Sequence, residues 1–150
     1  MPPIRMFDSQ RIQSPHLASM RDAVDAVLAS GRLVLGPALA EFEQAFAAYI
    51  GVAHCIGVAN GSDALELALR ALDVGPGSTV LTVANAGGYA TTAIRACGAQ
   101  VRHVDVDDQT LLIDVATLEL AVAERPQPLV LTHLYGQMAD AGRIAARILK

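Results

Sequence analysis

The sequence predicts an α/β domain whose parallel sheet is covered by helices on both faces. Short apolar runs alternate with runs of helical periodicity four times between residues 51 and 150. Strands that alternate with helices form β-α-β crossovers, and these produce parallel sheets. Most of the strand runs are rich in apolar residues, as expected for a sheet buried on both sides. A chain of 150 residues, 53% of them hydrophobic and 17% charged, suffices for one self-contained core.

Two helices are expected before the alternating part. Apolar residues recur at helical spacing within 15–30, and Gly31 follows where a C-cap glycine belongs. A loop with glycine at both its ends then leads through Pro37 into a second periodic run from Leu39 to Ile50. We therefore expect a domain over 1–150, with leading helices in 1–50 that pack on the sheet or on another subunit.

The alternating part, 51–150, contains four expected strands. Each strand run is followed by a turn signal and a helical run. The expected strands are 54–59, 79–84, 100–106 and 129–132, and the expected helices are 64–72, a small-residue stretch ending at Cys97, 116–123, and one from about Asp140.

Composition excludes several classes of protein. The net charge of −4 and the scattering of ten arginines, with Lys150 as the single lysine, leave no basic cluster for nucleic acid. No apolar run reaches the roughly 18 residues of a membrane helix, and the start lacks a signal-peptide pattern. Cys55 and Cys97 match no redox or zinc motif, so we expect free thiols in a cytoplasmic protein.

Ligands of parallel α/β sheets bind beyond the carboxyl ends of the strands, so the residues after each strand are candidates. After the first expected strand, Gly61 allows a tight turn, and Ser62 or Asp63 can cap the next helix. The N–H groups of the first turn and the helix dipole would then suit a phosphate. An ordinary helix start is the competing interpretation.

The other strand ends are less specific. Tyr89 follows two glycines and either covers a flat ligand or packs in the core. The acidic residues of 105–108 lack the glycine and glutamate of a calcium loop, which favours a solvated turn. His133 and Tyr135 are candidates for proton chemistry or for structure, and His103 is expected to be structural.

Taken together, five segments resemble the DegT/DnrJ/EryC1/StrS family of PLP-dependent sugar aminotransferases. The likeness covers nearly the whole chain in the family's order. The segments are SGRLVLGP (30–37), EFEQAFAAY (41–49), NGSDAL (60–65), GPG (75–77) and HLYGQ (133–137).

The resemblance implies the parallel-sheet large domain of fold-type I PLP transferases, here its N-terminal part, in an enzyme that usually forms a homodimer. Such enzymes move an amino group from glutamate or glutamine to a ketosugar nucleotide. By that resemblance, Gly61, Ser62 and Asp63 would hold the phosphate of pyridoxal 5′-phosphate (PLP). Where many members have Thr followed by Phe or Tyr, this chain has Ala86 and Gly87. Tyr89 is then the available ring to lie over the cofactor.

The resemblance also implies a truncated or inactive fragment. The aspartate that pairs with the pyridine nitrogen and the Schiff-base lysine lie beyond the matched region, and Lys150 does not map onto that lysine. In this fold the first strand, here 54–59, lies beside later strands, which would leave it unpaired and apolar surface exposed. The alternative is a non-catalytic module that binds PLP, a sugar nucleotide or a full-length relative.

Overall fold

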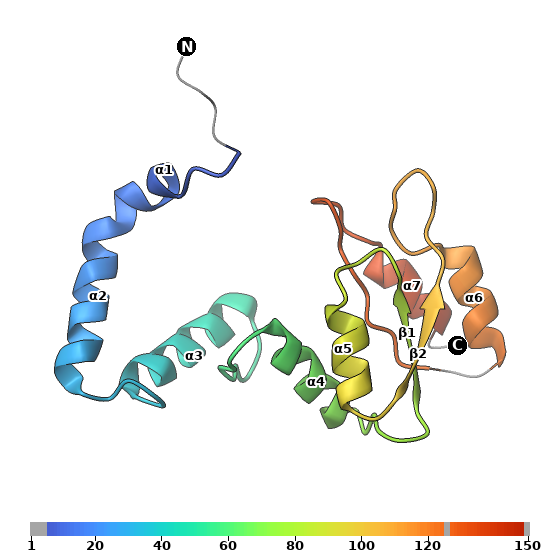
Figure 1. Ribbon diagram of the computed structural model, residues 1–150, viewed down its shortest axis with the longest axis horizontal. Coiled ribbons are helices and arrows are strands. Elements are labelled where there is room, and N and C mark those ends of the chain that lie inside the picture. Colours follow the sequence, from blue (N-terminus) through green and yellow to red (C-terminus); the bar gives the residue numbers. More distant parts are fainter. Residues whose placement is uncertain (1–5, 125–126, 149–150) are drawn as a thin grey trace, which may run out of the picture. The chain divides into compact units, whose positions relative to one another are not determined.

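The computed structural model of the protein describes residues 6–124 and 127–148 (Figure 1). The chain divides into two compact units, Met1–Gly57 and Val58–Lys150. The first unit is helical and the second is α/β, so the predicted fold class is observed. Each unit is described by itself below.

The first unit confirms both leading helices and adds two short turns before them. Helix α1 spans Ser9–Gln13, a 3₁₀ helix η1 spans Ser14–His16, and the long helices are α2, Leu17–Ser30, and α3, Pro37–Ile50. Gly31 ends α2 in the left-handed conformation (φ 66°), as the sequence predicts for a C-cap glycine.

The second unit contains a parallel two-stranded sheet and its crossover helices. Its elements, in chain order, are α4 (Gly61–Ala71), β1 (Thr79–Val83), α5 (Tyr89–Ala96), β2 (Gln100–Val104), α6 (Val115–Glu124) and α7 (Ala141–Ile148). Strands β1 and β2 pair with Thr79 opposite Gln100 and Val83 opposite Val104. The helices expected in this part of the sequence are all present within about three residues of their predicted bounds.

Two of the four expected strands are corrected. Residues 54–59 form no strand, because no described backbone segment supplies them with a ladder partner. Residues 129–132 contribute only an isolated parallel bridge between Leu129 and Leu81. Two backbone hydrogen bonds hold this bridge: Leu81 N–H donates to the Pro128 carbonyl (2.8 Å), and Val130 N–H donates to the Leu81 carbonyl (2.9 Å).

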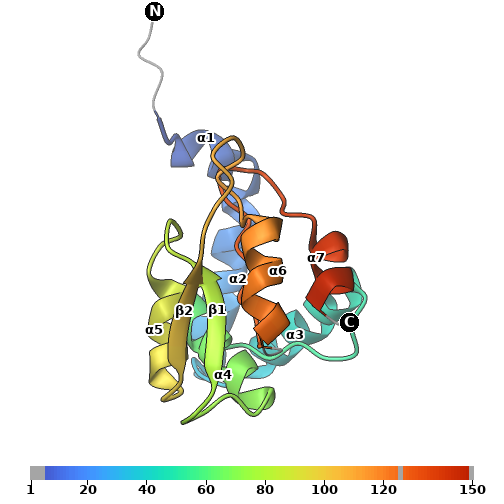
Figure 2. The ribbon, with the colours of Figure 1, turned by 90° about the vertical axis from the view of Figure 1, so that its right-hand side faces the viewer.

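The sheet is covered on both faces, as predicted, and each face has its own core (Figure 2). Alternating side chains of β1 divide between the cores, since Val80 belongs to one and Leu81 to the other. On one face Val80 packs with Leu69 of α4, with Ala93 and Ile94 of α5, and with the buried Cys97 that follows α5. On the other face Leu81 packs with side chains of α6 and α7: Leu118, Ala121 and Ile144.

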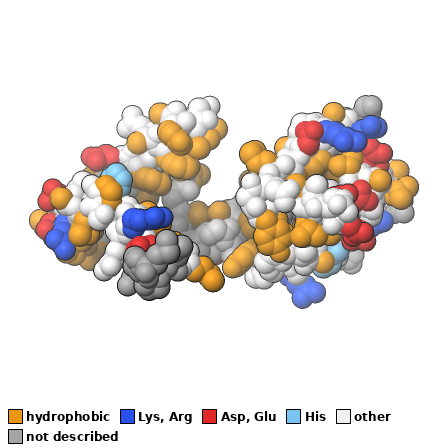
Figure 3. Space-filling view, turned by 90° about the horizontal axis from the view of Figure 1, so that it is seen from above, with side chains coloured by type: hydrophobic (Ala, Val, Ile, Leu, Met, Phe, Trp, Pro, Cys, Tyr) orange, Lys and Arg blue, Asp and Glu red, His pale blue; other side chains and the backbone are white. Residues whose placement is uncertain are grey.

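The first unit buries little of its apolar surface. Ala47 is the buried residue of α3, whereas none of the residues of α2 is buried. Large hydrophobic side chains on these helices are open to solvent, and Figure 3 shows such side chains at the surface of the molecule. On α3, Phe42 stacks on Phe46 with ring centroids 5.5 Å apart, but both rings remain exposed. Helices α2 and α3 therefore leave apolar side chains open within their own unit, and their packing on the sheet or on another subunit stays a prediction.

Among the described residues, no helix is both long and apolar enough to cross a bilayer.

Candidate functional site

The N-terminus of α4 is capped by Asn60, which corrects the expectation that Ser62 or Asp63 is the cap. The Asn60 Oδ1 accepts the backbone N–H groups of Ser62 (2.9 Å) and Asp63 (3.0 Å). An N-cap residue has an extended backbone and precedes the helix, and Asn60 satisfies this with φ −162° and ψ 173°. Ser62 and Asp63 already lie inside the first turn, where their own side chains are badly placed to cap it.

The same helix start retains donors for an anion. A Cβ atom added to Gly61 would meet nothing within 4 Å, so the space beside its backbone is open. Within the described residues the Ser62 hydroxyl makes no hydrogen bond, which leaves it free to donate. The positive end of an 11-residue helix dipole points to the same place. These groups fit a phosphate.

Asp63 contributes to such a site through its backbone only. Its Oδ2 accepts a hydrogen bond from the Asn60 Nδ2 (3.1 Å), and its carboxylate would repel a phosphate. Its N–H, however, points along the helix start with the N–H of Ser62, and both are held by the Asn60 Oδ1. Rotation of the Asn60 side chain would release both N–H groups to a ligand.

Tyr89 begins α5, and its side chain is 68% exposed. The alternative of core packing is therefore wrong for this ring, whereas the next residues on the helix, Ala90, Ala93 and Ile94, are buried. Helices α4 and α5 pack side by side, joined by a hydrogen bond from Arg70 Nη2 to the Ala96 carbonyl (2.9 Å). Figure 1 shows both helices with their N-terminal ends toward the carboxyl ends of the strands.

The loops that follow the strands are tied together at this edge. Asn85 Nδ2 donates to the Leu111 carbonyl (2.8 Å), and Gln137 Nε2 donates to the Thr110 carbonyl (3.2 Å). The loop containing Thr110 and Leu111 thus connects the loops after β1 and after the 129–132 segment. Both amides lie in the segments that follow the expected strands, but the sequence alone assigns them no role, since the signal is only a polar residue after each apolar run.

His133 has a structural partner. Its Nδ1 accepts the backbone N–H of the buried Ala139 (3.1 Å), which requires the proton of the neutral ring to be on Nε2. Tyr135 is exposed and has a left-handed backbone (φ 56°). His103 faces Thr91 with Nε2 and Oγ1 3.4 Å apart. The structural interpretation of His103 and His133 is the one that these contacts support.

The acidic segment 105–108 forms the predicted turn. Asp107 Oδ1 accepts the N–H of Gln109 (3.1 Å) and both the N–H (2.8 Å) and the hydroxyl (2.9 Å) of Thr110. The hydrogen bonds from Thr110 hold the pKa of Asp107 below its ordinary value. No cluster of three metal-ligating side chains exists among the described residues.

Asp114 caps α6 in the same manner. Its carboxylate accepts the Thr117 hydroxyl (2.6 Å) and the N–H groups of Thr117 (3.2 Å) and Ala116 (3.1 Å). The bond from the Thr117 hydroxyl is the largest cause of a lowered Asp114 pKa.

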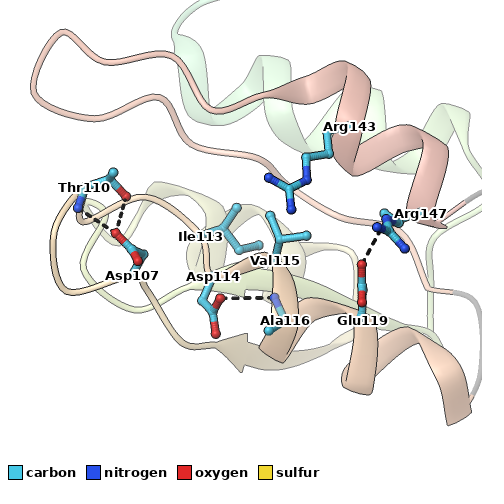
Figure 4. Close-up of a pocket in the computed structure, with 9 residues that line it drawn as sticks. All are labelled: Asp107, Thr110, Ile113, Asp114, Val115, Ala116, Glu119, Arg143 and Arg147. Carbon is cyan, nitrogen blue, oxygen red and sulfur yellow. Dashed lines mark hydrogen bonds and ion pairs between the residues drawn. The ribbon is translucent and has the colours of Figure 1, made fainter.

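A cavity of about 440 Å³ lies beside this turn (Figure 4). Its charged lining comes from Asp107, Asp114, Glu119 of α6, and Arg143 and Arg147 of α7. Arg147 Nε pairs with Glu119 Oε1 (3.1 Å), and the two aspartates are occupied by their own turns. The cavity includes none of Gly61, Ser62, Asp63 and Tyr89, and its ion pair, Glu119–Arg147, joins α6 to α7.

The fold is that of an α/β protein with a parallel sheet, a class in which ligands bind at the carboxyl edge of the sheet. The start of α4 offers donors that a phosphate would fit. The DegT/DnrJ/EryC1/StrS aminotransferase family matches residues 17–147, and the chain belongs to this family. The resemblance stated from the sequence is thereby confirmed.

Similar proteins include a dTDP-3-amino-3,4,6-trideoxy-alpha-D-glucose transaminase of Micromonospora megalomicea, 44% identical over 82% of this chain and 33% of that protein. The structure of S. venezuelae DesV in complex with a ketimine intermediate matches 98% of this chain and 40% of that chain, with 35% identity and a TM-score of 0.88. Spr1654 of Streptococcus pneumoniae in its PLP form matches 75% of this chain and 29% of that chain, with 29% identity and a TM-score of 0.70.

These likenesses confirm the large-domain fold of fold-type I PLP aminotransferases for the matched residues. The chain spans about a third of the length of the curated relatives it matches.

Proposed function

We propose that this chain forms the N-terminal part of the large domain of a PLP-dependent aminotransferase, one that transfers an amino group from glutamate or glutamine to a ketosugar nucleotide. The open start of α4 carries this proposal, because Gly61 and Ser62 offer phosphate donors at the carboxyl edge of the sheet. Membership of an aminotransferase family and similarity to a dTDP-sugar transaminase support the reaction and the substrate class.

PLP, when bound, supplies the electron sink that amino-group transfer requires. The residues of this chain would act on the cofactor by binding and orientation. The Gly61 N–H and the Ser62 hydroxyl would hold the phosphate, joined by the N–H groups of Ser62 and Asp63 once Asn60 turns away. The exposed ring of Tyr89 would lie against the flat face of the cofactor.

The proposal extends to a cytoplasmic homodimer. The exposed apolar side chains of α2 and α3 support an additional partner for these helices, since exposed apolar patches mark surfaces that bind other proteins.

Binding of pyridoxamine 5′-phosphate to the 150-residue chain tests the phosphate site. This ligand has no aldehyde, so it avoids adducts with surface amines. Pyridoxamine without the phosphate is the control ligand, and Ser14→Ala, an exposed serine of the first unit, is the control for Ser62→Ala. A hydrogen bond to a charged group contributes about 1.5–3 kcal/mol, so we expect Ser62→Ala to weaken binding by about tenfold or more.

Equilibrium dialysis gives the dissociation constants. Binding that prefers the phosphorylated ligand and falls in Ser62→Ala but not in Ser14→Ala would support the site. Equal binding of both ligands, or equal loss in both variants, would contradict it.

A further inference from the structure

The ring of Tyr89 folds back over Gly87. A Cβ atom added to Gly87 would lie 2.6 Å from Cε2, 3.0 Å from Cδ2 and 3.6 Å from Cζ of Tyr89. The main chain closes the same turn, since the Tyr89 N–H and the Gly87 carbonyl oxygen are 2.6 Å apart. The ring thus lies where a side chain of residue 87 would begin.

The Tyr89 ring can fold back because Gly87 has no Cβ atom, and the fold-back requires no unusual backbone conformation. Gly87 is not among the residues with positive φ, so its backbone conformation is open to alanine. All three nearest atoms to the added Cβ belong to the Tyr89 ring, a side chain that is free to rotate. Alanine at 87 would therefore turn the ring away and leave the main chain in place.

The neighbouring glycine offers the opposite case. A Cβ added to Gly88 would meet nothing within 4 Å, and Gly88 also lacks a positive φ. Gly88→Ala makes the same chemical change one residue further on without touching the ring, and it is the matched control.

We propose that Gly87 is a positioning residue: its missing Cβ leaves the room in which the Tyr89 ring folds back, so that the exposed face of the ring meets the pyridine ring of the cofactor. This inference rests on the proposed function. The resemblance expects an aromatic side chain at position 87, and the fold-back brings the ring of residue 89 to that position. Glycine at 87 and tyrosine at 89 then act as one unit in place of a single aromatic residue.

The first test needs no ligand. NMR should show contacts between the Tyr89 ring protons and the Gly87 Hα protons, and an upfield ring-current shift of those Hα protons that Tyr89→Leu abolishes. Gly87→Ala should lose these contacts, whereas Gly88→Ala should keep them, with circular dichroism equal in all variants. Persistence of the ring contacts in Gly87→Ala would overturn the proposal.

The second test measures the affinity for pyridoxamine 5′-phosphate. From the usual strength of aromatic pairs, we expect Gly87→Ala and Tyr89→Leu each to weaken binding about three- to tenfold. The double variant should bind no more weakly than Tyr89→Leu alone, because both changes remove the same contact. Gly88→Ala should bind as the parent chain does.

The outcomes separate the two proposals. Weaker binding in Ser62→Ala with unchanged binding in Gly87→Ala overturns the role of Gly87 and leaves the phosphate site standing. Independent, additive losses in the double variant also overturn it. No binding by the parent chain overturns the proposed function and this inference together.

Discussion

At the scale of single residues, the polar side chains at the carboxyl edge of the sheet are first of all turn formers. Asn60 and Asp107 each use one side-chain oxygen, and Asp114 uses both of its carboxylate oxygens, to accept backbone N–H groups two and three residues ahead. Such bonds satisfy donors that a turn or a helix start would otherwise leave unpaired. A carboxylate is therefore not free for catalysis merely because it follows a strand.

The lowered pKa values of Asp107 and Asp114 predict that the stability of the folded chain falls in acid. Their pKa values are lowered from 3.8 in the folded chain, so unfolding raises them. Their stabilising contribution is fully present above pH 3.8 and is lost as pH falls through the folded pKa values. Asp114→Ala should lower the free energy of unfolding at pH 7. The gap in free energy of unfolding between this variant and the parent chain should shrink toward pH 2.

Urea titrations followed by circular dichroism at several pH values measure this difference. Asp108→Ala is the control, because the Asp108 carboxylate makes no hydrogen bond within the described residues. A difference between Asp114→Ala and the parent chain that stays constant from pH 7 to pH 2 would contradict the prediction.

At the scale of elements, helix α4 combines stability and ligand binding in one cap. Asn60 holds the N–H groups of Ser62 and Asp63, the same donors that a phosphate would use. Capping by asparagine stabilises a helix by about 1 kcal/mol relative to alanine, whereas a bound anion supplies its own hydrogen bonds. The cap and the ligand therefore compete for two backbone donors.

Two substitutions at position 60 separate these roles. Asn60→Ala should lower the free energy of unfolding by about 1 kcal/mol and keep or increase the affinity for pyridoxamine 5′-phosphate. Asn60→Asp should keep the cap but weaken binding, because a second carboxylate would join Asp63 beside the phosphate. Denaturation and dialysis on the same samples measure the stability and the affinity. Tighter binding by Asn60→Asp would contradict the prediction that the cap and the phosphate compete for the same N–H groups.

At the scale of the whole molecule, the chain exposes much apolar surface. Phe42, Phe46 and Tyr49 are 55%, 42% and 84% exposed on α3, and further large side chains are open on α2. The second unit, in contrast, has a core on each face of its sheet. Apolar surface of this extent binds partners or dyes in solution.

We expect the purified chain to bind a hydrophobic fluorescent dye strongly and to show low protection of backbone amides in hydrogen exchange within 6–57. Phe42→Ser combined with Phe46→Ser should reduce the dye signal, whereas Thr92→Ser, on the exposed side of α5, should not. A monomer that does not bind the dye and unfolds in one cooperative transition would contradict this prediction.

Local signals in the sequence determined most of the elements. Helical spacing placed α2, α3, α4 and α6, and the β-branched run of 79–84 placed β1. Gly31 gave the end of α2 because a left-handed C-cap favours glycine on local grounds alone. The family could also be recognised from the sequence, because its motifs lie in short contiguous segments such as 60–65 and 133–137.

Only the tertiary structure decided which apolar runs are strands, because a strand exists through its neighbour. Residues 54–59 resemble a strand in composition but have no pairing partner in the described chain, and 129–132 is limited to the bridge at Leu129. The cap by Asn60 and the fold-back of Tyr89 over Gly87 likewise depend on atomic positions. The sequence by itself thus determined the family and the local elements. Strand pairing arose from contacts between distant segments, which no local pattern encodes, and the placement of the Asn60 and Tyr89 side chains required atomic positions.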